Sequence, residues 1–290
     1  MKILKNKVGL YLYLLLPIRF SWFLINEYEK KRILENDYRY NNSRDDYRPQ
    51  DYQEGMSWDK FSIKNDYRGW MSSIDTFLGP NKSLSVLEIG PGSGFYSRYI
   101  CEHNSVGHYS FYEINEGFSI YLKKKLKFVN KKFFTYSEID IKKPTVSQNT
   151  KFKYDRIIFL SSFHHMPNRK FVFDKIDCLL KKNKKSKILF IEPTHYFFRI
   201  VQLCKKFIWT YRNAKYQFLY DNLSTHHFCT LKEFQLFSMK NKTVNCKFLV
   251  QSKKIRAFLS FGNKFLPTPI ANFIKLFFSN VMVVTMINKN

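Results

Sequence analysis

The chain has 290 residues, of which 44% are hydrophobic and 18% aromatic, enough to bury the core of one large domain with additions. Its net charge of +26 indicates either an anionic partner (nucleic acid, a membrane surface or an acidic substrate) or a lysine-rich chain with solvated Lys faces. The five cysteines form no C-x-x-C pair, so the sequence supports neither a disulfide framework nor a zinc site.

Residues 1–70 are predicted to form an N-terminal helical and basic extension with a lid. Three lysines precede the apolar run 8–16, which is too short to span a bilayer, and no small-residue cleavage site follows it. The run is either an interfacial helix on an anionic membrane or a helix that packs on the following domain. The polar, tyrosine-rich stretch 27–64 predicts a linker or lid. The expected location is the cytoplasm, or the inner face of its membrane.

A glycine-rich turn dominates the next part of the chain. A helix is predicted over 70–78, and an apolar strand over 85–89. Directly after this strand come three glycines at alternate positions: Gly90, Gly92 and Gly94. Helical spacing then resumes to about residue 103. Strand, glycine turn and helix form the entrance of a nucleotide-binding unit, because glycines permit a tight turn and a close approach of the backbone to a ligand. We expect a single domain over 71–290 to be built around this turn.

Acidic side chains are predicted near the ends of the next two strands. The second strand, 109–114, carries Glu113 about twenty residues past the glycines, where a carboxylate accepts hydrogen bonds from both hydroxyls of a ribose. After a lysine-edged helix, the third strand, 132–141, carries Glu138 and Asp140.

Polar residues follow the fourth strand at its carboxyl end. Ligands of open α/β sheets bind at the carboxyl ends of the strands, so residues 160–165 should border the site. Asp155 opens this strand at the opposite edge, and its expected role is structural. A fifth strand over 187–191 is followed by Glu192 at the same edge as the site. Five strand–helix units in succession predict a doubly wound parallel sheet.

The second half of the chain extends beyond such a minimal fold. Residues 194–220 are aromatic and basic, and a loop with His226 and His227 precedes a helix that opens at Thr230. The insert 255–279 interleaves phenylalanines with Lys and Arg. It either packs against the sheet or forms a basic, aromatic surface that enters the headgroup layer of a membrane.

The pattern Glu-x-Gly-x-Gly-x-Gly at 88–94 resembles motif I of the small-molecule type of class I S-adenosylmethionine-dependent methyltransferases. Dinucleotide-binding proteins prefer G-x-G-x-x-G, and a carboxylate suits a cationic ligand better than a diphosphate. The resemblance implies a Rossmann-like, doubly wound, mostly parallel seven-stranded α/β sheet, closed by an antiparallel pair over 243–251 and 280–287. It implies S-adenosyl-L-methionine as the cofactor, bound by Glu88, Gly90, Gly92, Gly94, Glu113, Asp140 and Ser161.

The resemblance also assigns roles to these residues. Glu88 would help to place the aminoacyl end of the cofactor and Glu113 its ribose. Asp140, preferred here over Glu138, would bond the adenine amine. An oxygen acceptor needs a base to take its proton. The candidate catalytic residues are His226, His227, His164 and His165. Further candidate bases are Glu192, His195 and Tyr196. No metal is implied, because these residues show no ligand spacing.

The acceptor of the methyl group is not named by the sequence. No N-P-P-Y-type turn of the nucleic-acid methyltransferases is present, so a small-molecule, lipid-linked or saccharide-linked acceptor is favoured over nucleic acid, with oxygen favoured over nitrogen. An anionic membrane surface is a second candidate partner, and the oligomeric state stays open. The alternative function is a catalytically degenerate methyltransferase-like domain that acts as a membrane-associated scaffold. The spacing of the glycines argues against a nicotinamide-dependent oxidoreductase.

Overall fold

The computed structural model describes residues 57–63, 66, 69–139, 153–166, 169–194, 229, 231–238, 241–250, 253–262 and 265–289. Several predictions concern residues outside these ranges: the N-terminal apolar run, Asp140, and the loop with His195, Tyr196, His226 and His227. Among the described residues, no helix has both the length and the apolar character needed to cross a membrane.

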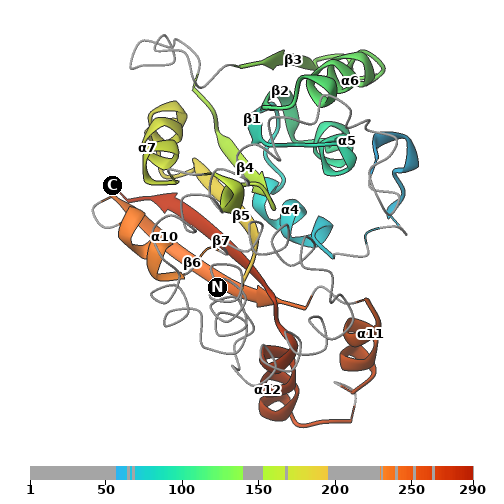
Figure 1. Ribbon diagram of the computed structural model, residues 1–290, viewed down its shortest axis with the longest axis vertical. Coiled ribbons are helices and arrows are strands. Elements are labelled where there is room, and N and C mark those ends of the chain that lie inside the picture. The colour runs from blue at the N-terminus through green and yellow to red at the C-terminus, as the bar shows by residue number, and fades with distance from the viewer. Residues whose placement is uncertain are drawn as a thin grey trace, which may run out of the picture.

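Seven strands form one sheet (Figure 1). They are β1 (Leu84–Ile89), β2 (Val106–Tyr112), β3 (Thr135–Glu138), β4 (Arg156–Leu160), β5 (Lys187–Pro193), β6 (Lys242–Leu249) and β7 (Val281–Asn288). Their order is β3-β2-β1-β4-β5-β7-β6, in which β1 to β5 are parallel and β7 is antiparallel to both neighbours. This confirms the predicted doubly wound, mostly parallel sheet with an antiparallel last strand.

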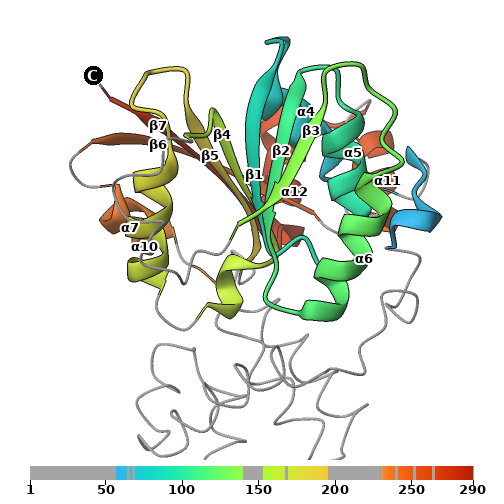
Figure 2. The same cartoon turned by 90° about the horizontal axis from the view of Figure 1, so that it is seen from above.

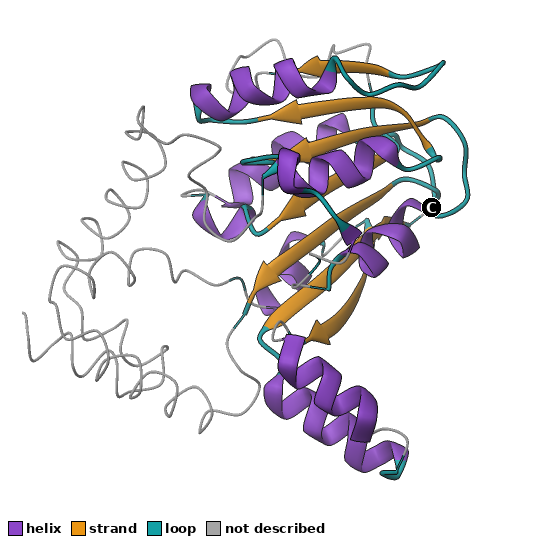
Figure 3. Ribbon diagram, turned by 90° about the vertical axis from the view of Figure 1, so that its right-hand side faces the viewer, coloured by secondary structure: helices purple, strands orange, loops and turns teal. Residues whose placement is uncertain are grey.

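Helices cover both faces of the sheet (Figure 2). The helices of the described chain are η3 (Trp58–Lys60), α4 (Met71–Leu78), α5 (Phe95–Glu102), α6 (Glu116–Leu126), η6 (Phe163–His165), α7 (Arg169–Leu179), α10 (Leu231–Phe237), α11 (Lys253–Gly262) and α12 (Thr268–Phe278), of which α11 and α12 project beyond the sheet (Figure 3). Val86 packs with α4, α5 and α6 on one face, whereas its neighbour Leu87 packs with α7 and α10 on the other. Since parallel strands are buried on both faces, most residues of β1, β4 and β5 are apolar.

Some boundaries differ from the sequence predictions. The second strand begins at Val106 and ends at Tyr112, so Glu113 lies just beyond it. The third strand is shorter than predicted on its N-terminal side. The fifth strand continues through Glu192 to Pro193 because β7 pairs with it to that point. A proline fits at position 193 because β4 ends opposite Ile191. The N–H group that proline lacks would therefore have had no partner on β4.

The amino edge of the sheet is held by charged side chains. The carboxylate of Asp155 accepts hydrogen bonds from the Ser85 N–H at 3.0 Å and the Lys181 ammonium at 2.8 Å. Arg156, only 2% exposed, donates to the carbonyl oxygens of Phe77 and Lys185. These contacts lie at the edge opposite the glycine turn, which confirms the structural role predicted for Asp155.

Part of the predicted lid is built into the domain. The Trp58 N–H donates to the Ser93 carbonyl at 3.2 Å, and the Trp58 side chain is buried against the core beside α5. Asp59 forms an ion pair with Lys125 and accepts a hydrogen bond from the Tyr121 hydroxyl, both on α6. Residues 57–63 therefore brace the outside of the glycine turn.

Candidate functional site

The three glycines of the turn all have positive φ, but each is needed for a different reason. A Cβ on Gly90 would lie 2.7 Å from the Ser162 Cβ, and one on Gly94 would lie 2.3 Å from a methyl carbon of Leu122. A Cβ on Gly92, with φ of +57°, would meet no atom of the described residues within 4 Å. Gly90 and Gly94 therefore allow close packing, whereas Gly92 borders space that is open among the described residues.

Glu113 ties the end of β2 to this turn. One of its carboxylate oxygens accepts a hydrogen bond from the Gly92 N–H at 2.8 Å, and the other accepts from the Asn115 N–H at 2.9 Å. Burial raises the pKa of Glu113, while these backbone N–H groups act in the opposite direction. A carboxylate offers about four acceptor positions, so two hydrogen bonds leave it able to accept from a ligand hydroxyl.

Glu88 lies beneath the turn and is 1% exposed. The Tyr109 hydroxyl of β2 donates a hydrogen bond to its carboxylate at 2.6 Å. Burial raises the pKa of Glu88 from 4.5 to about 7, although the hydrogen bond from Tyr109 favours the ionised form. The predicted acidic residue is therefore an interior group that supports the turn, and Tyr109 is a supporting residue that sequence reasoning missed.

The raised pKa of Glu88 predicts a pH dependence of stability. Between pH 4.5 and about 7 the folded state binds more protons at this site than the unfolded chain, so the free energy of unfolding falls as the pH rises, by up to about 3 kcal/mol. Glu88→Gln, which is neutral at every pH, should remove this component. Urea unfolding of both proteins at pH 5 and pH 7 measures it. Equal pH slopes for the two proteins would show that Glu88 titrates normally.

A second buried carboxylate organises the carboxyl ends of β4 and β5. Glu192 is fully buried, and one of its oxygens accepts from the N–H groups of Ser162 and Phe163 at 3.1 and 2.9 Å. Its other oxygen accepts from the His164 Nδ1–H at 2.7 Å. The prediction of Glu192 as a base at the cleft is corrected here, because the carboxylate is enclosed and occupied by the η6 turn.

Ser161 begins the turn between β4 and η6. Its φ of +56° lies in the left-handed region, which few residues other than glycine adopt. The Ser161 N–H donates to the Ile191 carbonyl at 2.8 Å, and the neighbouring Ser162 hydroxyl donates to the Ile89 carbonyl at 2.6 Å. Strained backbone of this kind is common at ligand sites. The structure thus brings Ser161 to the same edge of the sheet as the glycine turn.

The remaining predicted site residues have mixed outcomes. His164 is 6% exposed and held by Glu192, which favours a role in positioning the loop. His165 completes η6, and its side chain lies outside what the structure describes. Glu138 contacts the Ser119 hydroxyl and Lys123 of α6. Asp140, His226 and His227 lie outside the described residues. In the part of the chain that is described, no three His, Cys, Asp or Glu side chains gather as metal ligands do.

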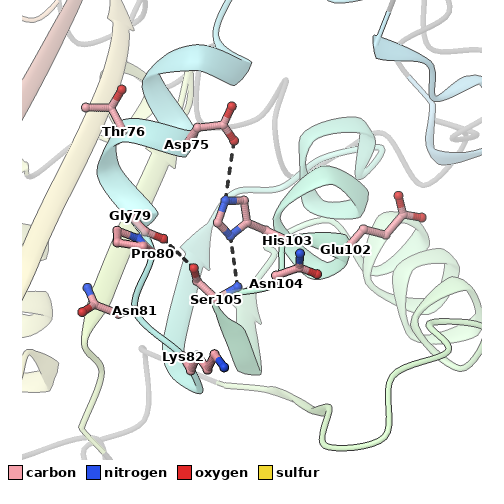
Figure 4. Close-up of a pocket in the computed structure, with 10 residues that line it drawn as sticks. All are labelled: Asp75, Thr76, Gly79, Pro80, Asn81, Lys82, Glu102, His103, Asn104 and Ser105. Atoms are coloured by element: carbon pink, nitrogen blue, oxygen red, sulfur yellow. Dashed lines mark hydrogen bonds and ion pairs between the residues drawn. The ribbon is translucent and has the colours of Figure 1, made fainter.

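A hollow lined mainly by polar residue types lies at the opposite edge of the sheet, at the amino ends of β1 and β2 (Figure 4). His103 lies 3.7 Å from the Asp75 carboxylate through Nε2, and its Nδ1 accepts from the Ser105 N–H at 3.2 Å. The Ser105 hydroxyl donates to the Gly79 carbonyl. Burial lowers the pKa of His103. These polar groups interact with one another and connect α4 to the end of α5. Their role is therefore structural.

Comparisons with known proteins agree with this geometry. A family model described as "Methyltransferase domain" matches residues 87–183. The cyclopropane synthase MmaA2 from Mycobacterium tuberculosis is 14% identical with a TM-score of 0.51, covering 83% of this chain and 90% of that one.

Two further solved structures are similar. The plantazolicin methyltransferase BpumL, in complex with SAH, is 14% identical with a TM-score of 0.49, covering 90% of this chain and 99% of that one. A methyltransferase from Bacillus halodurans is 12% identical with a TM-score of 0.45, covering 76% and 98%. No curated protein matches the sequence. Residues 87–183 therefore match a methyltransferase domain, and the sheet to which they belong has the class I, Rossmann-like fold found in S-adenosylmethionine-dependent methyltransferases.

Proposed function

We propose that this protein transfers the methyl group of S-adenosylmethionine to an oxygen or nitrogen atom of a small-molecule, lipid-linked or saccharide-linked acceptor. S-adenosylmethionine is the expected cofactor of the domain. The bound cofactor supplies a methyl group already activated on a sulfonium sulfur, so the protein contributes placement. An oxygen acceptor would in addition need a base, for which His226, His227 and His165 remain the candidates.

The open space at Gly92 is the observation that carries this proposal. Gly90 and Gly94 are crowded by protein atoms, whereas a side chain at Gly92 would meet none of the residues that the structure describes. The Gly92 N–H is held by Glu113, so the turn is fixed before any ligand arrives. A backbone surface that is rigid and uncovered fits a ligand lying close above it.

Glu113 and Ser161 flank this surface from the two neighbouring strands. Glu113 retains acceptor positions for the ribose hydroxyls, and its carboxylate is already oriented by two backbone N–H groups. Ser161, in its strained conformation, comes from β4 on the other side of β1. Glu88 supports the turn from below and does not need to touch the cofactor to fulfil that role.

Gly92→Asn tests the proposal. Asn tolerates the left-handed conformation, so the turn should fold while the new side chain fills the open space. We expect the variant to keep its folded circular-dichroism spectrum and to bind S-adenosylmethionine and S-adenosylhomocysteine at least about tenfold more weakly in calorimetric titrations, a loss of about 1.4 kcal/mol.

Ser83→Asn is the matched control. Ser83 also has a positive φ, of 58°, but it is exposed at the opposite edge of the sheet. Its substitution should leave the affinity unchanged. Undiminished binding by Gly92→Asn would show that the open space is not the cofactor site. A wild-type protein that binds neither ligand would favour the non-enzymatic alternative.

A further inference from the structure

The insert 255–279 is folded as a pair of helices, α11 and α12, between two strands that are already neighbours. Leu249 at the end of β6 pairs with Val281 at the start of β7. Antiparallel neighbours need only a short turn between them. Here the chain makes an excursion of two helices that lie side by side and extend away from the strands (Figure 3). The connection itself does not require this excursion.

The helices α11 and α12 bury some of their apolar side chains and expose others. Leu259 and Ala271 are buried, at 8% and 7% exposure. Large apolar side chains on other faces remain open to solvent. They are Phe258, Phe261, Phe265, Ile270 and Phe273, with exposed fractions of 64%, 66%, 73%, 49% and 56%. Monomeric proteins rarely gather this much apolar surface in one place without a partner for it. We call these five residues the apolar tip.

Every charged residue of α11 and α12 is basic. Exposed Lys254 lies on α11 and exposed Lys275 on α12. The sequence contains no Asp or Glu after Glu233. Long basic side chains beside aromatic ones suit the boundary between anionic headgroups and acyl chains, where the rings insert and the ammonium groups stay in the polar layer. The tip also projects from the domain, which suits insertion into a layer better than docking onto a rigid acidic protein.

The base of the helical pair is joined to the site. The Arg256 guanidinium donates to the Val250 carbonyl at 3.1 Å and to the Asp66 carbonyl at 3.4 Å. The Asp66 carboxylate in turn accepts from the Tyr96 hydroxyl in the first turn of α5, just after the glycine turn. The pairing of Leu249 and Pro193 with Val281 places the base at the carboxyl edge of the sheet.

We propose that α11 and α12 dock the protein on an anionic lipid bilayer by inserting the apolar tip into the headgroup layer. Docking there brings the carboxyl edge of the sheet close to the membrane surface. An acceptor carried by a lipid would then reach the site without leaving the bilayer, a consequence that rests on the proposed function.

Vesicle co-sedimentation of the full chain tests the docking. The protein should sediment with phosphatidylcholine vesicles that contain phosphatidylglycerol, and far less with phosphatidylcholine alone or at high salt, because salt screens the lysines. The triple variant Phe258→Ser, Phe261→Ser, Phe265→Ser should partition at least tenfold more weakly. The matched control replaces three exposed phenylalanines elsewhere: Phe128→Ser, Phe133→Ser and Phe171→Ser. It should bind as the wild type does.

Three outcomes would overturn the docking proposal. In the first, the wild-type protein stays in the supernatant. In the second, the triple variant binds the vesicles fully, as it would if the N-terminal run alone held the membrane. In the third, the wild type is a dimer and the triple variant is a monomer, which would make the tip a contact between copies of the chain. Titration with S-adenosylmethionine separates this proposal from the proposed function. The triple variant should bind the cofactor normally, and Gly92→Asn should still bind anionic vesicles.

Discussion

Replacing Gly94 with alanine should lower the free energy of unfolding by about 2–4 kcal/mol. The residue has a φ of +78°, where a side chain costs about 1–2 kcal/mol of backbone strain. The new Cβ would also lie 2.3 Å from the Leu122 methyl carbon and 3.3 Å from the Trp58 ring, and overpacking of this kind costs about 1–3 kcal/mol. Urea unfolding measures the loss.

A double-mutant cycle with Leu122→Val isolates the steric part of this cost. Valine lacks the methyl carbon that the new Cβ would meet, so the two substitutions together should cost clearly less than the sum of the single losses. Gly92→Ala is the companion variant, because it has the backbone strain without the clash. If Gly94→Ala were no more costly than Gly92→Ala, close packing against α6 would not explain the glycine.

The framework of the fold was predictable because its signals are local. Val86, Leu87 and Ile89 form a short apolar run before a glycine turn, and both features are set by neighbouring residues. The position of the last two strands came from the resemblance to a family, since nothing in their own composition fixes their partners. The acidic residue after β2 was also predictable. Its hydrogen bond to the Gly92 N–H was not, because that contact spans two separate turns.

The errors have a common cause in long-range packing. The sequence places Glu192 at the end of a strand, where a carboxylate would face the cleft. In the structure the turn that leads into η6 lies against the end of β5 and surrounds this carboxylate with N–H donors. Trp58 lies in a polar stretch without periodicity, so no local pattern indicated that it packs beside Gly94. The insert was ambiguous for a different reason: α11 and α12 have apolar residues on both a buried and an exposed side, and composition does not separate the two.

Replacing the buried Glu192 with leucine should cost about 3–5 kcal/mol of stability. The substitution keeps the volume but leaves the N–H groups of Ser162 and Phe163 and the His164 ring without an acceptor. Each unsatisfied buried donor costs about 1–3 kcal/mol, and some relaxation of the η6 turn limits the total. Glu192→Gln keeps one acceptor oxygen and should lose less. Urea unfolding again provides the measurement.

The same substitution should also weaken the site, because η6 begins at the turn that holds Ser161. Once the η6 turn is released from β5, the strained backbone at Ser161 has less to maintain it, so the affinity for S-adenosylmethionine should fall even in Glu192→Gln. Glu116→Gln is the control, since Glu116 is an exposed carboxylate in the first turn of α6 and should cost less than about 0.5 kcal/mol. Equal stability of Glu192→Leu and Glu116→Gln would mean that Glu192 does not anchor the loop. If Glu192→Gln were stable and kept its affinity for S-adenosylmethionine, the contacts of Glu192 with η6 would not contribute to the cofactor site.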